Sequence, residues 1–331
     1  MTAAPTRCAP LPDYTNGLSM ILLVGAGPMA VQYANVLKGM DKPFQVVGRS
    51  AQSAETFFAV VGFQPVVGGI EAYFDGDHPS VDSAIVAVSV EQLEYTSAYL
   101  LEQGVKQLLI EKPGGLTLAS IERLQQKAEG LGASVYIAYN RRFLASVLKA
   151  RELITEDGGV TSFNFEITEW SDTIKAIHKA EGVKENWFFA NTTHVTDLAF
   201  YLGGRPAQLS TFKAGALSWH ERAARFAGAG VTDAGALFSY SGDWEAPGRW
   251  AVEVLTKKRR FIFKPLEKLQ VQLINSVAVA PVDIDASLDS QYKPGLYLQV
   301  EHFLKADQEG LCSLSEHLEN SRLYARIAGY A

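Results

Sequence analysis

A short apolar run that ends in a glycine-rich turn is the feature that most constrains this chain. Residues 21–24 suit a buried strand and lead directly into Gly25-Ala26-Gly27-Pro28-Met29-Ala30. In such a turn the first glycine permits a tight bend, the second lets the backbone approach a pyrophosphate, and the small last residue lets helix and strand pack closely. The following helix then presents free N–H groups to phosphate oxygens. This segment therefore predicts a dinucleotide-binding unit.

The N-terminal half of the chain alternates between strand-like and helical patterns. Apolar, strand-like runs lie at 20–24, 44–48, 84–88, 107–111 and 134–138. Helical stretches separate most of them, and in 116–131 the apolar residues recur with a period of about 3.6 residues after the candidate N-cap Thr117. Alternating strands and helices predict a doubly wound parallel sheet with right-handed crossovers.

The pattern changes after Phe143, where strand-like runs follow one another without helices between several of them. These runs lie at 161–168, 235–240, 249–256, 260–264 and 269–273, and helices are expected at 193–201, 297–307 and 315–328. Such a succession favours an antiparallel or mixed sheet. We therefore predict a fold of the α/β class: an arm over 1–19, a Rossmann domain over 20–140 and an α+β domain over 141–331, whose last helices pack back on the Rossmann domain.

Length, charge and cysteine content narrow the class of protein. The 331 residues exceed what one core usually spans, which favours two domains. The net charge is −6 with no block of Lys or Arg, which argues against nucleic acid or an anionic membrane as partner. No apolar run approaches a membrane span, and two cysteines suit a reducing compartment, so we predict a cytoplasmic protein.

The residues after the second predicted strand bear on the choice of cofactor. A dinucleotide fold reads the ribose at this point: an acidic residue bonds the 2′-hydroxyl of NAD, whereas an arginine accommodates the 2′-phosphate of NADP. Here the strand ends in Arg49-Ser50, and no Asp or Glu occupies the turn. A guanidinium and a hydroxyl both suit a phosphate. We therefore predict NADP(H) as the preferred cofactor and NAD(H) as the alternative; the competing interpretation of Arg49 is a solvated surface residue.

The fifth predicted strand ends in Glu111-Lys112-Pro113-Gly114-Gly115, at the sheet edge where open α/β sheets bind ligands. Pro113 restricts Lys112 to an extended conformation. On spacing alone, a lysine at an ordinary strand exit is the favoured interpretation of this segment.

Taken together, the motifs resemble the Gfo/Idh/MocA oxidoreductase family. They are the glycine turn, Glu111-Lys112-Pro113, Tyr139-Asn140-Arg141-Arg142-Phe143 and the ending around Glu301-His302-Phe303, and the likeness runs from Met20 onward. It implies a second domain with an open, mostly antiparallel sheet. It also implies NAD(P)-dependent oxidation or reduction of a hydroxyl or carbonyl group on a sugar, sugar acid, sugar nucleotide or cyclitol. An open sheet has a face that a partner can bury, so we predict a homodimer or a higher homo-oligomer.

The resemblance also assigns residues to the cofactor. It places Lys112 near the nicotinamide and the reacting oxygen, and implies that the Lys112–Pro113 bond is cis. The residues predicted to contact the cofactor are Gly25, Gly27, Pro28, Met29, Ala30, Arg49, Ser50, Ser89, Glu111 and Lys112.

A second catalytic signature of the family, Asp-x-x-x-His, is only partly present. His194 occupies the histidine position and Asp197 fits the following His-x-x-Asp, but Ala190 stands where the family places its aspartate. The loop around Ser89 also differs from the usual Thr-Pro-Asn. By resemblance His194 is the proton-transferring group, for which its intrinsic pKa is suited, and Lys112 stabilises charge on the same oxygen. Without the resemblance, His194 would be read as a histidine satisfied at a helix start.

Substrate contacts are expected from the polar and aromatic segment before His194. The predicted contacts are Arg142, Trp170, Lys184, Asn186, Trp187, Asn191, Thr193 and His194. Lys175, His178, Lys179 and Lys184 suit either an anionic substrate or a solvated loop, between which the sequence does not choose.

Two other function classes compete with a dehydrogenase. One is a non-catalytic NADP-binding protein with a regulatory or scaffold role, which the alanine at position 190 keeps open. The other is a lyase or hydrolase on the same scaffold. The sequence has no Cys/His cluster with metal-ligand spacing, and hydride transfer needs no metal, so no metal is expected.

Overall fold

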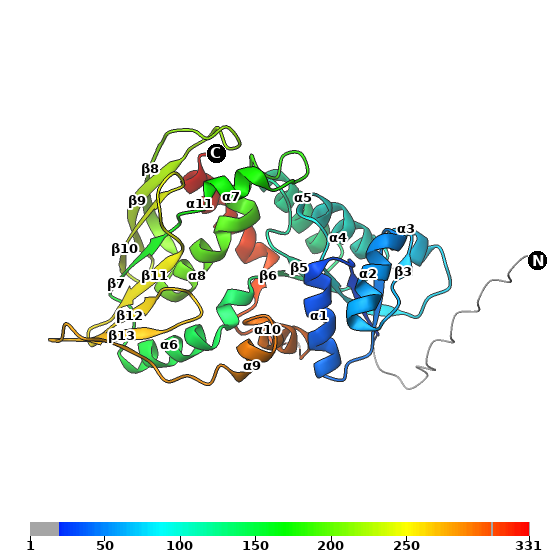
Figure 1. The fold of residues 1–331 in the computed structure, drawn as a ribbon, viewed down its shortest axis with the longest axis horizontal. Coiled ribbons are helices and arrows are strands. Elements are labelled where there is room, and N and C mark those ends of the chain that lie inside the picture. The colour runs from blue at the N-terminus through cyan, green and yellow to red at the C-terminus, as the bar shows by residue number, and fades with distance from the viewer. Residues whose placement is uncertain (1–19, 306, 331) are drawn as a thin grey trace, which may run out of the picture.

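A computed structural model describes residues 20–305 and 307–330 of the chain. Two β-sheets organise these residues, one in each half of the molecule (Figure 1). The smaller sheet and its helices occupy the blue and cyan half at the right, and the larger sheet forms the green and yellow edge at the left. The predicted arm over 1–19 lies outside the described residues.

The seven-stranded sheet is a Rossmann fold with the strand order β15-β6-β5-β4-β1-β2-β3. The pairs among strands β1 to β6 are all parallel. Its strands are β1 (Met20–Val24), β2 (Phe44–Gly48), β3 (Val66–Val67), β4 (Val81–Val86), β5 (Gln107–Glu111), β6 (Ser134–Ala138) and β15 (Cys312–Ser313). The connecting helices are α1 (Pro28–Gly39), α2 (Ala51–Val61), α3 (Gly69–Phe74), α4 (Leu93–Glu102) and α5 (Leu118–Gly130). The predicted cap is confirmed, because the Thr117 side chain accepts the N–H of Ser120.

The eight-stranded sheet has the order β14-β13-β12-β11-β7-β10-β9-β8. All of its pairs are antiparallel except that of β7 with β10. The strands are β7 (Ser162–Glu166), β8 (Pro206–Ala214), β9 (Arg225–Thr232), β10 (Leu237–Asp243), β11 (Ala251–Leu255), β12 (Arg259–Phe263), β13 (Gln270–Leu273) and β14 (Val279–Pro281). The sequence predicted neither β8 nor β9, because β8 is largely exposed and β9 is rich in glycine and alanine, so neither contains an apolar run.

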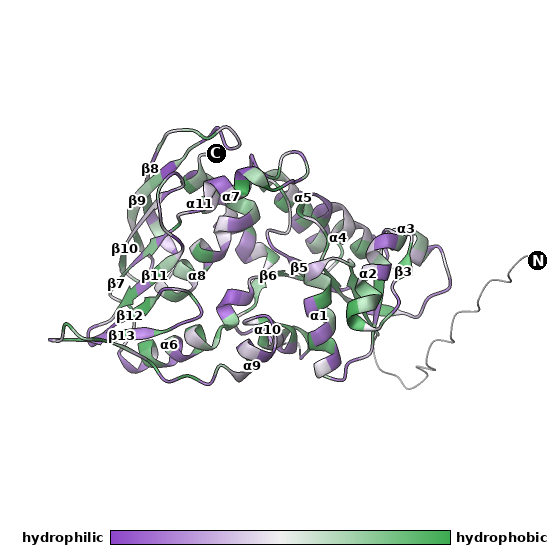
Figure 2. Ribbon diagram, in the orientation of Figure 1, coloured by the Kyte–Doolittle hydropathy of each residue, from purple (hydrophilic) through white to green (hydrophobic). Residues whose placement is uncertain are grey.

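Within the described residues, helices cover one face of the large sheet and leave the other open. The side chains of Phe163, Phe165 and Phe238 are buried on the face against which α8 (Thr193–Gly203) packs. On the strands at one end, Phe212 and Leu237 are 70% and 63% exposed. Figure 2 shows the corresponding mixture of apolar and polar residues along these strands.

The end of the chain returns to the Rossmann sheet. The helix α10 (Leu296–Leu304) packs on α1, β15 pairs antiparallel with β6, and α11 (Leu314–Ala328) packs on α5. The remaining α-helices are α6 (Ala145–Glu156), α7 (Ser171–Ala176) and α9 (Ser287–Gln291). Among the described residues, no helix is both long and apolar enough to span a membrane.

Candidate active site

The space around the glycine turn at the end of β1 fits the residues that occupy it. Gly25 has φ +127°, and a Cβ there would lie 2.3 Å from the carbonyl oxygen of Ala87. A Cβ on Gly27 would meet nothing within 4 Å, so this position faces open space at the start of α1. Ala30 is fully buried and lets α1 lie against the sheet. The turn therefore has the shape that a pyrophosphate needs, with the N-terminus of α1 open beside it.

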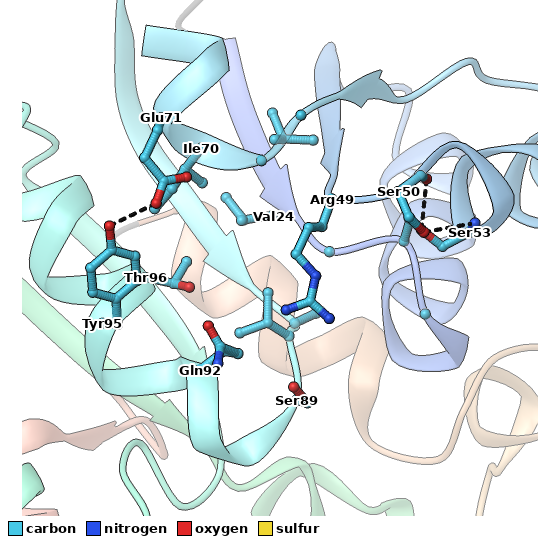
Figure 3. Close-up of a pocket in the computed structure, with 18 residues that line it drawn as sticks. Val24, Arg49, Ser50, Ser53, Ile70, Glu71, Ser89, Gln92, Tyr95 and Thr96 are labelled. Atoms are coloured by element: carbon cyan, nitrogen blue, oxygen red, sulfur yellow. Dashed lines mark hydrogen bonds between the residues drawn. The ribbon is translucent and has the colours of Figure 1, made fainter. Parts of the chain in front are cut away.

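A cavity of about 370 Å³ lies on one side of this turn, between β1, β2 and α4. Figure 3 shows the Arg49 side chain extending into it from the end of β2. Among the described residues, none forms an ion pair or side-chain hydrogen bond with Arg49 that would occupy its guanidinium. Ser50 also lines the cavity, but its hydroxyl caps α2 by accepting the N–H of Ser53. Arg49 thus offers an available cation next to a helix N-terminus.

The same cavity contains one carboxylate, that of Glu71 at the start of α3. The Tyr95 hydroxyl donates to it over 2.7 Å (Figure 3). This hydrogen bond lowers the pKa of Glu71, so the group is negatively charged at neutral pH. Its position on α3 differs from the end of β2, where an NAD-selective carboxylate would be expected.

A second cavity of about 720 Å³ shares Gly27, Ala87, Val88 and Ser89 with the first. The two cavities therefore form one continuous cleft across the glycine turn. Of the residues predicted for the cofactor and the substrate, this second cavity is lined by Gly27, Pro28, Met29, Ser89, Glu111, Lys112, Asn191 and His194. The Ser89 hydroxyl donates to Glu91, at the entrance to the helical turn that follows β4.

Lys112 lies at the end of β5, and its peptide bond to Pro113 is cis, as the resemblance implies. Its ammonium donates to the carbonyl oxygen of Ala190 over 2.5 Å. Burial lowers the pKa of Lys112 to about 8, against the opposing charges of Glu111 and Glu169. A lysine with this pKa is in part neutral and in part charged near physiological pH, as proton transfer requires.

His194 lies in the first turn of α8 and is buried between Tyr139 and Trp250. Its Nδ1 has no hydrogen-bond partner among the described residues. Burial, together with the positive charges of Arg141 and Lys112, lowers the pKa of His194 well below its usual value. The imidazole is therefore neutral at neutral pH, and His194 lies at the wall of the second cavity.

Position 190 has no carboxylate, but the carboxylate of Glu169, from another segment of the chain, lies close to it. Ala190 provides only its backbone carbonyl, but the buried carboxylate of Glu169 accepts hydrogen bonds from Asn191 (2.9 Å) and Thr192 (2.7 Å). Arg249 pairs with the same carboxylate at 2.7 Å. Glu169 thus places negative charge beside the turn that carries Ala190 and raises the pKa of Lys112. Sequence reasoning missed it because it lies 21 positions before Ala190.

The sequence also missed most of the cations around this cavity. Those that line it are Lys112, Arg141, Lys179, Arg249 and Lys293, together with His178. Lys179 and His178 belong to the loop that the sequence singled out, whereas Arg141, Arg249 and Lys293 come from three other segments.

Arg142, which was predicted to contact the substrate, does not line the cleft. Its guanidinium forms a bidentate pair with Asp197 (2.8 and 2.6 Å) and also contacts Glu316 at 2.7 Å. Both Arg142 and Asp197 are buried. The arginine that faces the cleft is its neighbour Arg141.

Five further predicted substrate residues do not line the cleft. The Trp170 ring is half exposed, stacks with Arg249 and lines a separate cavity beside Trp219 and Trp244. Trp187 packs against Trp219 in the core. The other three side chains bind backbone carbonyls: Lys184 that of Lys175, Asn186 that of Gly182, and Thr193 that of Phe189. In residues 20–305 and 307–330, no group of three or more His, Cys, Asp or Glu side chains is arranged to hold a metal ion.

Comparison with known proteins identifies the N-terminal domain. Residues 20–139 match the GFO_IDH_MocA family, described as an oxidoreductase family with an NAD-binding Rossmann fold. No curated protein shows significant sequence similarity to the chain.

Solved structures share the fold over nearly the whole chain. Levoglucosan dehydrogenase in complex with NADH and levoglucosan is 16% identical and superposes with a TM-score of 0.74, over 94% of this chain and 96% of that one. UDP-N-acetylglucosamine 3-dehydrogenase from Acidithiobacillus ferrooxidans is 14% identical (TM-score 0.72, 93% and 96%). An oxidoreductase from Agrobacterium radiobacter, in complex with NAD+, L-tartaric acid and magnesium, is also 14% identical (TM-score 0.73, 92% and 94%). At these identities the likeness concerns the fold.

Proposed function

Because residues 20–139 belong to the Gfo/Idh/MocA family of oxidoreductases, we propose that the chain is an NADP(H)-dependent dehydrogenase or reductase. Its substrate is a secondary hydroxyl or carbonyl group of a sugar, sugar acid, sugar nucleotide or cyclitol. One observation carries the proposal: Lys112 and His194, from different domains, line a cavity that is continuous with the glycine turn. Fold neighbours that are dehydrogenases of levoglucosan and of a sugar nucleotide support the substrate class.

The residues around the cleft fit a dinucleotide. The open face of Gly27 and the N-terminus of α1 would hold the pyrophosphate, and the unpaired guanidinium of Arg49 would hold a 2′-phosphate. The larger cavity would hold the nicotinamide and the substrate. When bound, the cofactor supplies or accepts the hydride.

The pKa shifts lead us to assign the roles of Lys112 and His194 in proton transfer differently from the sequence-based expectation. In our proposal Lys112, with its pKa of about 8, exchanges the proton with the reacting oxygen. His194 stays neutral because burial and the neighbouring positive charges lower its pKa well below its usual value, so it orients that oxygen by a hydrogen bond. Glu169 holds Asn191 and Arg249 in place and supplies the charge that Ala190 lacks.

The direct test is consumption of NADPH with a panel of keto-sugars and keto-acids, measured at 340 nm as the absorbance of the reduced nicotinamide. Turnover of one class of substrate is the expected result. If the protein binds NADPH tightly but a broad panel gives no turnover with the wild type, the non-catalytic alternative replaces the proposal.

Replacing Arg49 by aspartate is expected to weaken NADPH binding by about 10–100-fold, because charge-assisted bonds to a phosphate are lost and repulsion replaces them. NADH, which lacks that phosphate, should bind nearly as before. Fluorescence titration of both cofactors measures the two dissociation constants, with Arg205→Asp on the exposed surface as the control. Equal losses for NADPH and NADH would contradict the assignment of NADP.

We also propose that the molecule is a cytoplasmic homo-oligomer that pairs through the open face of the large sheet. Apolar side chains such as Phe212 and Leu237 are exposed there. Sedimentation velocity gives the oligomeric state directly, and a purely monomeric species at micromolar concentration would rule this assembly out.

A further inference from the structure

Arg141 is a cation without a partner at the wall of the proposed active site. It follows β6, and its guanidinium lies over the Trp250 ring at 5.0 Å. Its Nε is buried and lacks a hydrogen-bond partner, and no carboxylate among the described residues forms an ion pair with it. Burial lowers the pKa of Arg141 to about 10, although the charge of Glu267 opposes this. Arg141 is half-buried, so its charge has lost part of its hydration without gaining an ion-pair partner among the described residues.

Arg141 differs from the neighbouring Arg142 in lacking an ion-pair partner among the described residues. Arg142, the next residue, has its charge neutralised by Asp197 and Glu316. The short helical turn over Asn140–Phe143 points the two guanidinium groups in different directions, one into a buried ion pair and one towards the cleft. Charged groups that lose hydration in folded proteins are normally paired, so the partner of Arg141 is expected to come from outside the described residues, as a bound ligand would.

The surrounding groups favour an anion as that partner. The charged lining of the cavity comprises the cations Lys112, Arg141, Lys179, Arg249 and Lys293, and the carboxylates Glu91 and Glu111. Glu111 is bound by the Tyr33 hydroxyl, and burial raises its pKa. Glu169 forms an ion pair with Arg249, and its charge acts on Lys112 and Arg141 without an ion-pair contact. The cavity is therefore cationic within a chain whose net charge is −6.

We propose that the substrate of this site carries an anionic group, a carboxylate or a phosphate, which Arg141 binds while the reacting carbon lies at Lys112 and His194. The planar guanidinium matches the two oxygens of such a group, and the Trp250 ring packs against it with its centroid 5.0 Å from Cζ. The cofactor's own phosphates are not the partner, because the glycine turn and Arg49 provide for them on the other side of Gly27. This inference rests on the proposed function for the identity of the reacting end, but not for the anion site itself.

Calorimetric titration of the NADP+-loaded full chain tests the inference without turnover. The probes are anions and their neutral counterparts: D-glucuronate and D-glucose 6-phosphate against D-glucose, and L-tartrate against L-threitol. We expect at least one anion to bind about ten-fold or more tightly than its neutral counterpart. In Arg141→Gln this preference should disappear, with unchanged affinity for NADPH and for the neutral probes, whereas Arg205→Gln should behave as wild type.

Two results would overturn the inference: no preference for the anion in any pair, or an anion preference that survives in Arg141→Gln. A thermal melt and the NADPH affinity of Arg141→Gln verify that the variant is folded. Failure of the dehydrogenase assignment gives a different result, namely anion binding that depends on Arg141 together with no NADPH consumption on any substrate.

Discussion

Replacing Lys112 by methionine is expected to lower kcat by about 10²–10³-fold, with NADPH affinity changed much less. The loss has this size because one pre-positioned donor to a developing oxyanion typically contributes that much. Methionine keeps most of the length and the apolar stem of lysine but has no proton to give. The ammonium of Lys112 already lies within 2.5 Å of the Ala190 carbonyl and so is fixed in position at the cavity wall. Steady-state assays at saturating cofactor measure the change.

The pH dependence of the same reaction gives an independent check. In the direction of carbonyl reduction Lys112 must be protonated, so kcat should fall as the pH rises through about 8. Oxidation of the hydroxyl needs the neutral amine, so its rate should rise over the same interval. Lys112→Met should abolish both limbs. Lys175→Met, in the last turn of α7 and outside the cleft, serves as the control. A Lys112→Met enzyme with wild-type kcat would refute the assignment.

Replacing Arg142 by methionine is expected to reduce the free energy of unfolding by about 3–5 kcal/mol at pH 7, because the variant leaves the Asp197 carboxylate buried without its cation. The main remaining donor is the Tyr324 hydroxyl, at the long distance of 3.5 Å. Urea unfolding followed by circular dichroism gives the difference. This result would distinguish a structural role for Arg142 from the substrate contact that the sequence predicted.

The penalty in Arg142→Met should depend on pH with a definite sign. Burial raises the pKa of Asp197, and Arg142 opposes this, so removing Arg142 raises the pKa further. The carboxyl group then takes up a proton as the pH falls, and the protonated form costs less to bury, so the destabilisation should shrink below neutral pH. The control is Glu122→Gln, which breaks the exposed pair with Arg322 between α5 and α11 and should cost about 0–1 kcal/mol. Equal effects of the two variants would refute the structural role.

Much of the fold was predictable because its signals are local. The strands at 20–24, 44–48, 107–111 and 134–138 are confirmed, since each is buried on both faces and therefore reads as a continuous apolar run. The strand predicted at 84–88 instead covers Val81–Val86, so it begins three residues and ends two residues earlier than predicted. The two-residue strand β15 was not predicted, because its place in the sheet depends on pairing with β6 from the far end of the chain.

The candidate site was predictable only where a motif determines both the residue type and the direction in which its side chain points. Lys112 at a strand end and His194 at a helix start both face the cleft, as the motifs indicated. For the pair Arg141 and Arg142, the residue type could not say which arginine faces the ligand, because one short helical turn decides it. Likewise, Ala190 signalled a missing carboxylate, but no local pattern pointed to Glu169 as the group beside it.

The sequence by itself determined the Rossmann unit, its glycine turn and the cationic residue after β2, because these depend on neighbours within a few residues of each other. Only the tertiary structure decided the charge state of the site. The pKa values of Lys112 and His194 are set by burial and by charges from segments far apart in the chain. The guanidinium of Arg141 is free because no carboxylate in the described part of the chain forms an ion pair with it. Desolvation and Coulomb interactions act through space, so they are not encoded in the spacing of residues along the chain.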